Sequence, residues 1–298
     1  MYINAYKPKG TVRHKNLISL TTAAREDVFE YIYRTRDFKL KARVGEKNSC
    51  LAGKYVAMIS KSSYFRTQVA FRIAVESLGG FPIIIPLVGT AIEESLKDCD
   101  VIRNLRDYGI SAFLVDTSFD HDAELLERYA ASPVIDANAK VGPCFALSSL
   151  LTVREKFGKL SGLKLTFIGD CSSGDNSILT GAAKCGMNLN IVSPKELLPS
   201  KKIVDYCRQF CNVELFTDKE DGIRGTDVIY VNENDFGDEY ALDELDLAFA
   251  HKDAIVLHSF PLVRKKSISD DAADCPQSMI FEQAANLVYA LEAALSFI

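Results

Sequence analysis

Short apolar runs alternate with segments of helical periodicity along almost the whole chain, and this alternation is the strongest constraint on its fold. The runs are continuous rather than alternating with polar residues, which is typical of strands buried on both faces. Strands that alternate with helices form parallel sheets covered by helices. The predicted strands span residues 55–59, 81–85, 112–115, 133–135, 164–168, 188–192, 213–216, 228–231 and 255–258.

The segments between these runs carry apolar residues at helical spacing, and some end at glycine, as 66–78 does at Gly79. The alternation restarts after a long predicted helix at 142–158. A chain of 298 residues is long enough for two domains, so we expect two α/β domains, each a parallel sheet flanked by helices. The predicted helices span about 22–42, 66–78, 93–108, 120–131, 142–158, 176–186, 200–210 and 276–297.

Composition and charge exclude several classes of protein. The net charge of −5 argues against nucleic acid as the main partner. We expect no membrane span, because no apolar run reaches 18 residues, and the first residues lack the apolar core of a signal peptide. The eight cysteines form no CxxC pair and no cluster with histidine, so we expect no metal site, no cofactor and reduced thiols in a cytoplasmic protein.

The stretch 55–78 predicts an anion-binding turn. An apolar strand leads into Ser62 and Ser63, and a helix follows from Arg66. The first turn of a helix presents unpaired backbone N–H groups and the positive end of the helix dipole. Arg66 adds a guanidinium that binds a phosphate or a carboxylate through two hydrogen bonds. The alternative is that these hydroxyl residues only cap the helix.

Other polar segments also follow predicted strands. In open parallel sheets, ligands bind beyond the carboxyl ends of the strands. We therefore expect a ligand cleft between the two domains, formed by loops that follow the strands. These loops are 60–68, 116–119, 169–176, 232–237 and 258–264.

The stretch from Ile59 to Gln68 resembles the Ser-Thr-Arg-Thr-Arg phosphate loop of the aspartate/ornithine carbamoyltransferase family. Further segments resemble this family in the same order along nearly the whole chain. Among them, Leu257-His258-Ser259-Phe260-Pro261 is similar to the family's His-x-x-Pro turn. The others are 51–54, 78–80, 150–162, 167–170, 193–199, 227–230 and 281–286.

The resemblance implies a fold, an assembly and a reaction. The first expected domain is of the carbamoyl-phosphate-binding type and comprises residues 1–141 and the closing helix 277–298. The second is of the amino-acid-binding type and comprises residues 142–276. Family members transfer a carbamoyl group from carbamoyl phosphate to an amino-acid amine, by orientation and electrostatic stabilisation. The expected partners are therefore a small anionic molecule, an amino acid and, as in the family, two further copies in a homotrimer.

The same resemblance assigns roles to individual residues. Arg66 and Thr67 are expected on the phosphate, and His258 near the reacting carbonyl, so that Arg66 and His258 are the catalytic candidates. The remaining substrate-binding candidates are Ser63, Tyr64, Phe65, Gln68, Ser172, Asn232 and Pro261. His258 is alternatively a structural histidine, and Cys144 has no histidine beside it to make it a nucleophile.

Several family residues are replaced. Tyr64 and Phe65 stand where the phosphate loop has Ser and Thr, and Gln68 where it has its last Arg; Ser62 and Ser63 replace the hydroxyls if one residue is inserted. Asp116 replaces an Arg that ends a strand. In the linker-helix motif, Gly142 and Phe145 replace the His and the Gln, and further on Asn232 replaces the amine-binding Asp and Leu287 an Arg.

These replacements leave two functions open. The first is a divergent carbamoyltransferase that acts on an amino-acid amine. The second is a catalytically inactive homologue that serves as a binding or regulatory subunit, alone or beside an active homologue. The cationic residues Lys61, Arg103 and Arg264–Lys266 could take over phosphate contacts that the replaced residues no longer make. Alternatively, they form a solvated surface.

Overall fold

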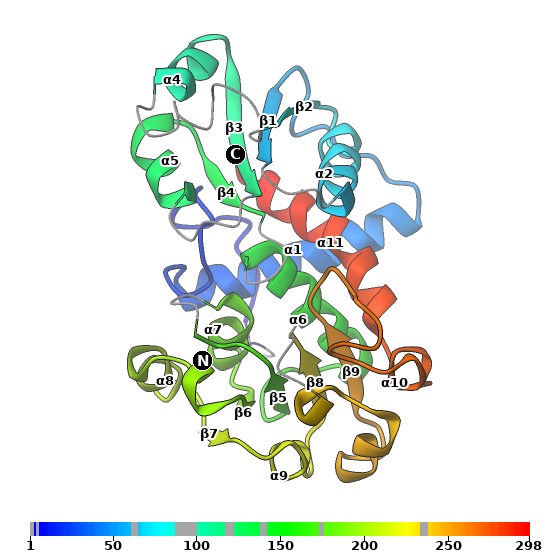
Figure 1. Ribbon diagram of the computed structural model, residues 1–298. Helices are drawn as coiled ribbons and strands as arrows, with labels where there is room; N and C mark the ends of the chain where they lie inside the picture. Colours follow the sequence, from blue (N-terminus) through cyan, green and yellow to red (C-terminus); the bar gives the residue numbers. More distant parts are fainter. Residues whose placement is uncertain are drawn as a thin grey trace. The chain divides into compact units, whose positions relative to one another are not determined.

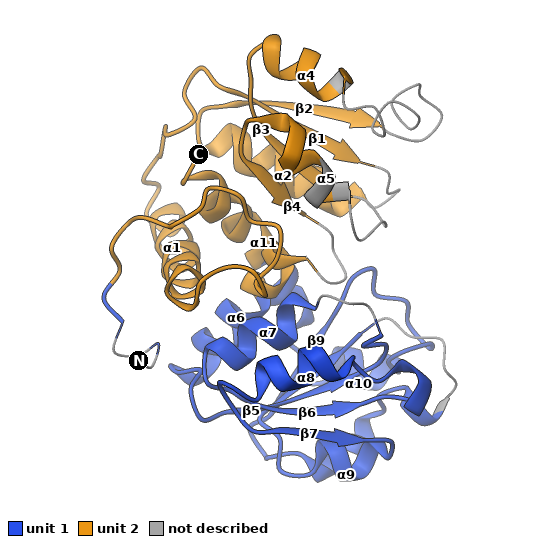
Figure 2. Cartoon of the chain, turned by 90° about the vertical axis from the view of Figure 1, so that its left-hand side faces the viewer, with its two compact units in different colours: residues 1–7, 149–285 blue, residues 8–148, 286–298 orange. Residues whose placement is uncertain are grey.

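The computed structural model describes residues 3, 6–60, 65–86, 100–116, 122–137, 142–172, 176–232 and 238–298 (Figure 1). The chain divides into two compact units. Unit 1 comprises residues 1–7 and 149–285, and unit 2 comprises residues 8–148 and 286–298 (Figure 2). The helices α6, Pro143–Phe157, and α11, Ile280–Leu295, each contribute residues to both units.

Unit 2 contains a four-stranded parallel sheet in the order β2-β1-β3-β4. β2 lies on one side of β1 and β3 lies on the other side, so the strand order reverses between β1 and β3. At that position the last residues of the two strands, Ser60 and Asp116, pair in register. The strands are β1 Tyr55–Ser60, β2 Phe81–Pro86, β3 Ile110–Asp116 and β4 Val134–Asp136.

Apolar residues of the sheet and its helices form the core of unit 2. Ile59, Phe113 and Val115 from the strands pack with Leu126 from a helix, and all four side chains are buried. The helix α1 begins with acidic residues and ends with basic ones, which complements its dipole. In the described residues of this unit, the helices besides parts of α6 and α11 are α1 Arg25–Arg43, α2 Phe65–Ser77, α4 Asp100–Asp107 and α5 Asp122–Ala130.

Unit 1 contains a five-stranded parallel sheet in the order β7-β6-β5-β8-β9. The order reverses between β5 and β8, and ligands bind at such reversals in sheets of this kind. The strands are β5 Lys164–Ile168, β6 Asn188–Val192, β7 Val213–Phe216, β8 Val228–Val231 and β9 Ile255–His258.

Short helices connect the strands of unit 1, and several begin at a side chain that accepts a hydrogen bond from the first turn. Asn176, Ser200, Asp218 and Ser269 cap their helices in this way. The helices are α7 Ser177–Lys184, α8 Lys201–Cys207, α9 Lys219–Ile223 and α10 Asp270–Asp274, with 3-10 turns η2 Lys195–Leu197, η3 Asp238–Tyr240 and η4 Glu244–Phe249.

The predicted fold class, two α/β domains built on parallel sheets, is confirmed. The first predicted helix starts within the expected segment 21–26, but the capping arrangement predicted for Thr22 is wrong. That helix begins at Arg25, because the Thr22 hydroxyl bonds the Ser19 carbonyl and the N-cap position holds Ala24. The helix predicted at 93–108 lies partly outside the described residues, and its described part begins at Asp100. Within the described parts of the chain, no helix is both long and apolar enough to cross a membrane.

Candidate functional site

The strand reversal in unit 2 carries a buried acid. Asp116 ends β3 and is 2% exposed, and Ser60 beside it ends β1 and is also buried. The Gln68 amide, from the first turns of α2, donates to the Ser60 hydroxyl at 3.1 Å. This edge therefore combines a helix N-terminus, which favours anions, with a carboxylate, which repels them.

The first turn of α2 places the sequence-predicted residues in different environments. Phe65 begins the helix and is 67% exposed, so its ring does not fill a pocket among the described residues. Arg66 is exposed, Thr67 is buried and Gln68 is half-buried. Ser63 and Tyr64 lie outside the described residues, as does the alternative pair of hydroxyls that includes Ser62.

The start of α6 holds small and apolar groups. Gly142, Cys144 and Phe145 are buried. Burial raises the pKa of the Cys144 thiol far above its ordinary value, with a smaller contribution from Asp136. A buried neutral thiol is a poor nucleophile, which agrees with the expectation that Cys144 has no catalytic role.

The strand reversal in unit 1 is a close approach between two backbones. Gly169 follows β5 with a φ of 131°, and a Cβ atom built on it lies 2.9 Å from the Cβ of Asn232. Asn232 follows β8, its backbone N–H donates to the Ile168 carbonyl, and its side chain donates to the Asp170 carbonyl at 3.2 Å. Only glycine fits here without strain, so this contact fixes where the Asn232 side chain lies.

The polar residues after β5 form a turn of their own. Both the backbone N–H and the hydroxyl of Ser172 donate to one Asp170 carboxylate oxygen, at 2.7 and 2.6 Å. Ser172 thus stabilises the loop on which it lies. Ser173 and Asp175 lie outside the described residues.

Two buried polar atoms near the carboxyl ends of these strands lack a partner among the described residues. They are Nδ2 of Asn176, the N-cap of α7, and Oγ of Ser193, which follows β6. Buried polar atoms are normally paired with protein groups, water or ligand. Neither residue is among the site residues predicted from the sequence, although an Asn directly before an apolar helix is a recognisable capping signal.

His258 ends β9 and is completely buried in a hydrogen-bond network. Its Nδ1 contacts the Ser259 carbonyl, and its Nε2 lies 2.7 Å from the Ser267 hydroxyl. Because a carbonyl only accepts, Nδ1 carries the proton in this contact, and in the neutral ring Nε2 accepts from Ser267. The backbone N–H of His258 donates to Gln283, whose side chain donates to Ser149.

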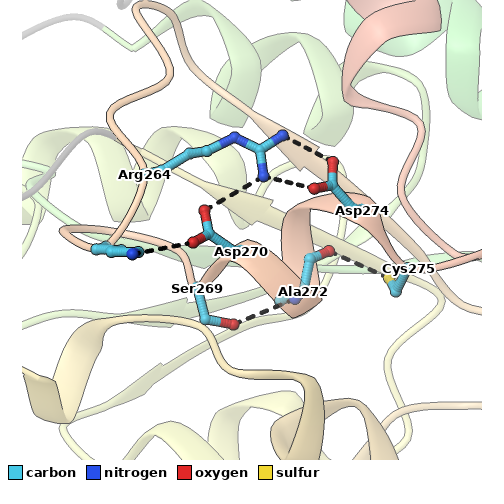
Figure 3. A network of polar contacts seen from close by, with 7 residues as sticks. Arg264, Ser269, Asp270, Ala272, Asp274 and Cys275 are labelled. Atoms are coloured by element: carbon cyan, nitrogen blue, oxygen red, sulfur yellow. Dashed lines mark hydrogen bonds and ion pairs between the residues drawn. The ribbon is translucent and has the colours of Figure 1, made fainter.

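The chain that follows this network turns at Phe260–Pro261, a cis peptide bond, and then reaches a cationic segment. Arg264 binds the Asp274 carboxylate through two hydrogen bonds of 2.6 and 2.7 Å and contacts Asp270 at 3.3 Å (Figure 3). Lys265 forms a further ion pair with Asp270. The Arg264 hydrogen bonds lower the pKa of Asp274. An anionic ligand of Arg264 therefore has to compete with two carboxylates.

The structure thus distributes the sequence-predicted residues over both units. Phe65, Arg66, Thr67 and Gln68 lie together at the start of α2 in unit 2. Unit 1 carries Ser172, Asn232, His258 and Pro261, each in a segment that follows or ends a strand. Among the residues that the structure describes, no group of three or more His, Cys, Asp or Glu side chains is placed to hold a metal ion.

Comparisons with known proteins agree on one family. The family model for the carbamoyl-P binding domain of aspartate/ornithine carbamoyltransferases matches residues 15–155, and the model for their Asp/Orn binding domain matches residues 161–298. The ornithine carbamoyltransferase of Anoxybacillus flavithermus is 30% identical over 95% of this chain and 96% of its own length. That of Acidothermus cellulolyticus is 33% identical over 82% of this chain and 84% of its own length.

Solved structures give the same result. The ornithine carbamoyltransferase from Pyrococcus furiosus superposes with a TM-score of 0.87 at 25% identity, over 95% of this chain and 96% of its own. The enzyme from Gloeobacter violaceus superposes with a TM-score of 0.85 at 28% identity, over 96% and 99% of the two chains.

Proposed function

Because the chain belongs to the aspartate/ornithine carbamoyltransferase family, we propose that it transfers a carbamoyl group from carbamoyl phosphate to the amine of an amino acid. The observation that carries this proposal is the match of both family domains, together with relatives named ornithine carbamoyltransferase at 30% identity over 95% of the chain. Ornithine is therefore the first acceptor to test.

In the proposed reaction, the acceptor nitrogen attacks the carbamoyl carbon, the bond from that carbon to the phosphate oxygen breaks, and the proton of the nitrogen passes to the departing phosphate. Arg66 and Thr67, on the first turn of α2, bind the phosphate. The family resemblance places His258 near the reacting carbonyl. Because the Ser259 carbonyl and the Ser267 hydroxyl already engage both of its ring nitrogens, we propose that it acts there by holding the turn that leads to Pro261. Ser172 and Asn232 orient the acceptor, and no metal or cofactor takes part.

A second candidate function follows from Asp116. This carboxylate is buried at the strand reversal of unit 2, where phosphate is expected, and like charges repel strongly at a buried site. In this second candidate, the chain retains the fold as an inactive ligand-binding or regulatory subunit, alone or with an active homologue.

Calorimetry and an activity assay distinguish the two functions. We expect carbamoyl phosphate to bind the wild type, and Arg66→Ala to weaken binding by about 10- to 100-fold, since a hydrogen bond to a charged group contributes about 1.5–3 kcal/mol. The matched control is Arg72→Ala, an exposed arginine on the same helix that pairs with Glu76. Carbamoylated product with ornithine, aspartate, lysine or putrescine supports the transferase. Absence of both binding and product contradicts it and favours the inactive subunit.

An exposed apolar surface on unit 2 supports the proposed homotrimer. Phe65, Val69 and Ile73 follow one another at four-residue spacing on α2 and are each at least 49% exposed. Residues at this spacing share one face of a helix, and exposed apolar patches usually mark interfaces. We expect light scattering to give the mass of three chains for the wild type and of one chain for Val69→Lys. A monomeric wild type contradicts this expectation.

A further inference from the structure

A polar pocket of about 390 Å³ lies in unit 2, between the segment 14–23, helix α1 and the end of α5. It is separate from the strand reversal. Asn16, one of its lining residues, accepts a hydrogen bond from the backbone N–H of Val134 at the amino end of β4. The candidate donor site, in contrast, lies at the carboxyl ends of β1 and β3.

Two polar side chains of α1 that line this pocket are almost completely buried. Asp27 and Tyr31 are 6% and 1% exposed, and a spacing of four residues places them on one face of the helix. The Tyr31 hydroxyl has no hydrogen-bond partner among the described residues. Asp27 accepts one backbone hydrogen bond, from Arg13 at 3.2 Å, and no side chain of the described residues donates to it.

Both groups are therefore buried with incomplete hydrogen bonding, which costs free energy unless a ligand or water completes it. Burial raises the pKa of Asp27 and of Tyr31 above their ordinary values. A carboxylate in this environment is stabilised by a cation that also donates hydrogen bonds. The tyrosine hydroxyl donates to any oxygen acceptor beside that cation.

Charged and polar groups of both signs surround the entrance. Asn16 donates to the exposed Glu127 at 2.6 Å, and His14 and Arg128 are also exposed lining residues. The entrance therefore repels neither a small cation nor a zwitterion. The only acid at depth among the described lining residues is Asp27.

We propose that this pocket binds a small organic ammonium ion, whose N–H groups donate to Asp27 and whose neighbouring oxygen accepts from the Tyr31 hydroxyl. Free amino acids and amino alcohols have this arrangement of groups. The site is distinct from the candidate donor site, since Asn16 contacts the start of β4, which pairs with Phe113 in the middle of β3, while Ser60 and Asp116 end β1 and β3.

The test uses ethanolamine as the probe and the full-length chain, by calorimetry and thermal unfolding. We expect saturable binding to the wild type, and no binding of ethylene glycol, which has the oxygens without the charge. Asp27→Asn is expected to abolish binding. Tyr31→Phe is expected to weaken it about fivefold, the effect of one neutral hydrogen bond. The matched control is Tyr33→Phe on the same helix, outside this pocket, which leaves binding unchanged.

If Asp27→Asn does not fold, Tyr31→Phe still tests the proposal, and thermal unfolding without ligand shows whether this second variant is folded. Because the Tyr31 hydroxyl lacks a partner, Tyr31→Phe is expected to unfold at the same temperature as the wild type or higher, while it binds ethanolamine less well. No saturable binding to the wild type at 100 mM, the same response to ethylene glycol, or unchanged affinity in Tyr31→Phe each overturns the proposal, and the pocket then holds only water.

Discussion

At the scale of single residues, the chemistry of the candidate donor site depends on Asp116. The family resemblance places an arginine at the end of β3, and the chain has a buried carboxylate there instead. One substituted side chain thus changes a group that attracts phosphate into one that repels it. Arg66 and the N-terminus of α2 act in the opposite direction, so the balance between these charges decides whether the donor binds.

Asp116→Asn tests this balance. Removing the negative charge while keeping the side-chain volume is expected to tighten binding of carbamoyl phosphate by about tenfold or more, because charge repulsion in a partly buried site exceeds about 1.4 kcal/mol. Calorimetry measures the change. The control is Asp136→Asn, a half-buried acid at the end of the neighbouring strand β4. Equal affinities of the wild type and Asp116→Asn contradict a repulsive role for Asp116.

Glu292 predicts a pH dependence of stability. It is 5% exposed on α11, and burial raises its pKa despite a hydrogen bond from Ser77. A raised folded-state pKa means that the folded chain holds the proton more tightly than the unfolded chain. The protonated Glu292 therefore contributes to the free energy of unfolding. This contribution is present in full below the unfolded-state pKa and is lost as the pH rises through the folded-state pKa.

Glu292→Gln is neutral at every pH and is therefore expected to raise the unfolding temperature at pH 8 by about 2 °C or more relative to the wild type. At pH 4, where the wild-type carboxyl keeps its proton, the difference is expected to vanish. Thermal unfolding followed by circular dichroism at both pH values measures it. A variant that is less stable than the wild type at pH 8 argues against a burial cost at Glu292.

At the scale of secondary-structure elements, the contact of β5 with β8 fixes the geometry of unit 1. Gly169→Ala is expected to lower the free energy of unfolding by about 2–4 kcal/mol, because the new methyl group meets Asn232 and the residue has a φ of 131°. Gly158→Ala is the matched control, since Gly158 has a positive φ but no atom near its Cβ position. Its expected cost is about 1–2 kcal/mol. Urea unfolding compares the two, and an equal cost contradicts the close-contact argument.

The elements themselves were largely predictable from the sequence, and many of the interactions between them were not. Continuous apolar runs such as 164–168 and 228–231 reveal buried strands because burial on both faces leaves no alternation. The partner of His258, in contrast, is Ser267, nine residues further along an irregular segment. No local sequence pattern reveals that the Tyr31 hydroxyl is buried without a hydrogen-bond partner among the described residues.

At the scale of the whole molecule, the sequence predicted a two-domain α/β chain of the carbamoyltransferase family, and the comparisons confirm the family and the fold. Family membership rests on many segments in a fixed order, each of which tolerates substitutions. Activity rests on a few side chains, and the sequence resemblance predicts that several of those differ in this chain. The fold was therefore predictable from the sequence, whereas establishing the reaction requires the binding measurements on the Arg66 and Asp116 variants.

The path of the chain between the two units has a consequence for truncation. The chain passes from one unit to the other after residues 7, 148 and 285. A shortened gene product that stops at residue 148 carries none of the final thirteen residues of unit 2, and one that starts at residue 149 lacks the first seven of unit 1. A single break in the chain therefore releases neither unit with all of its residues.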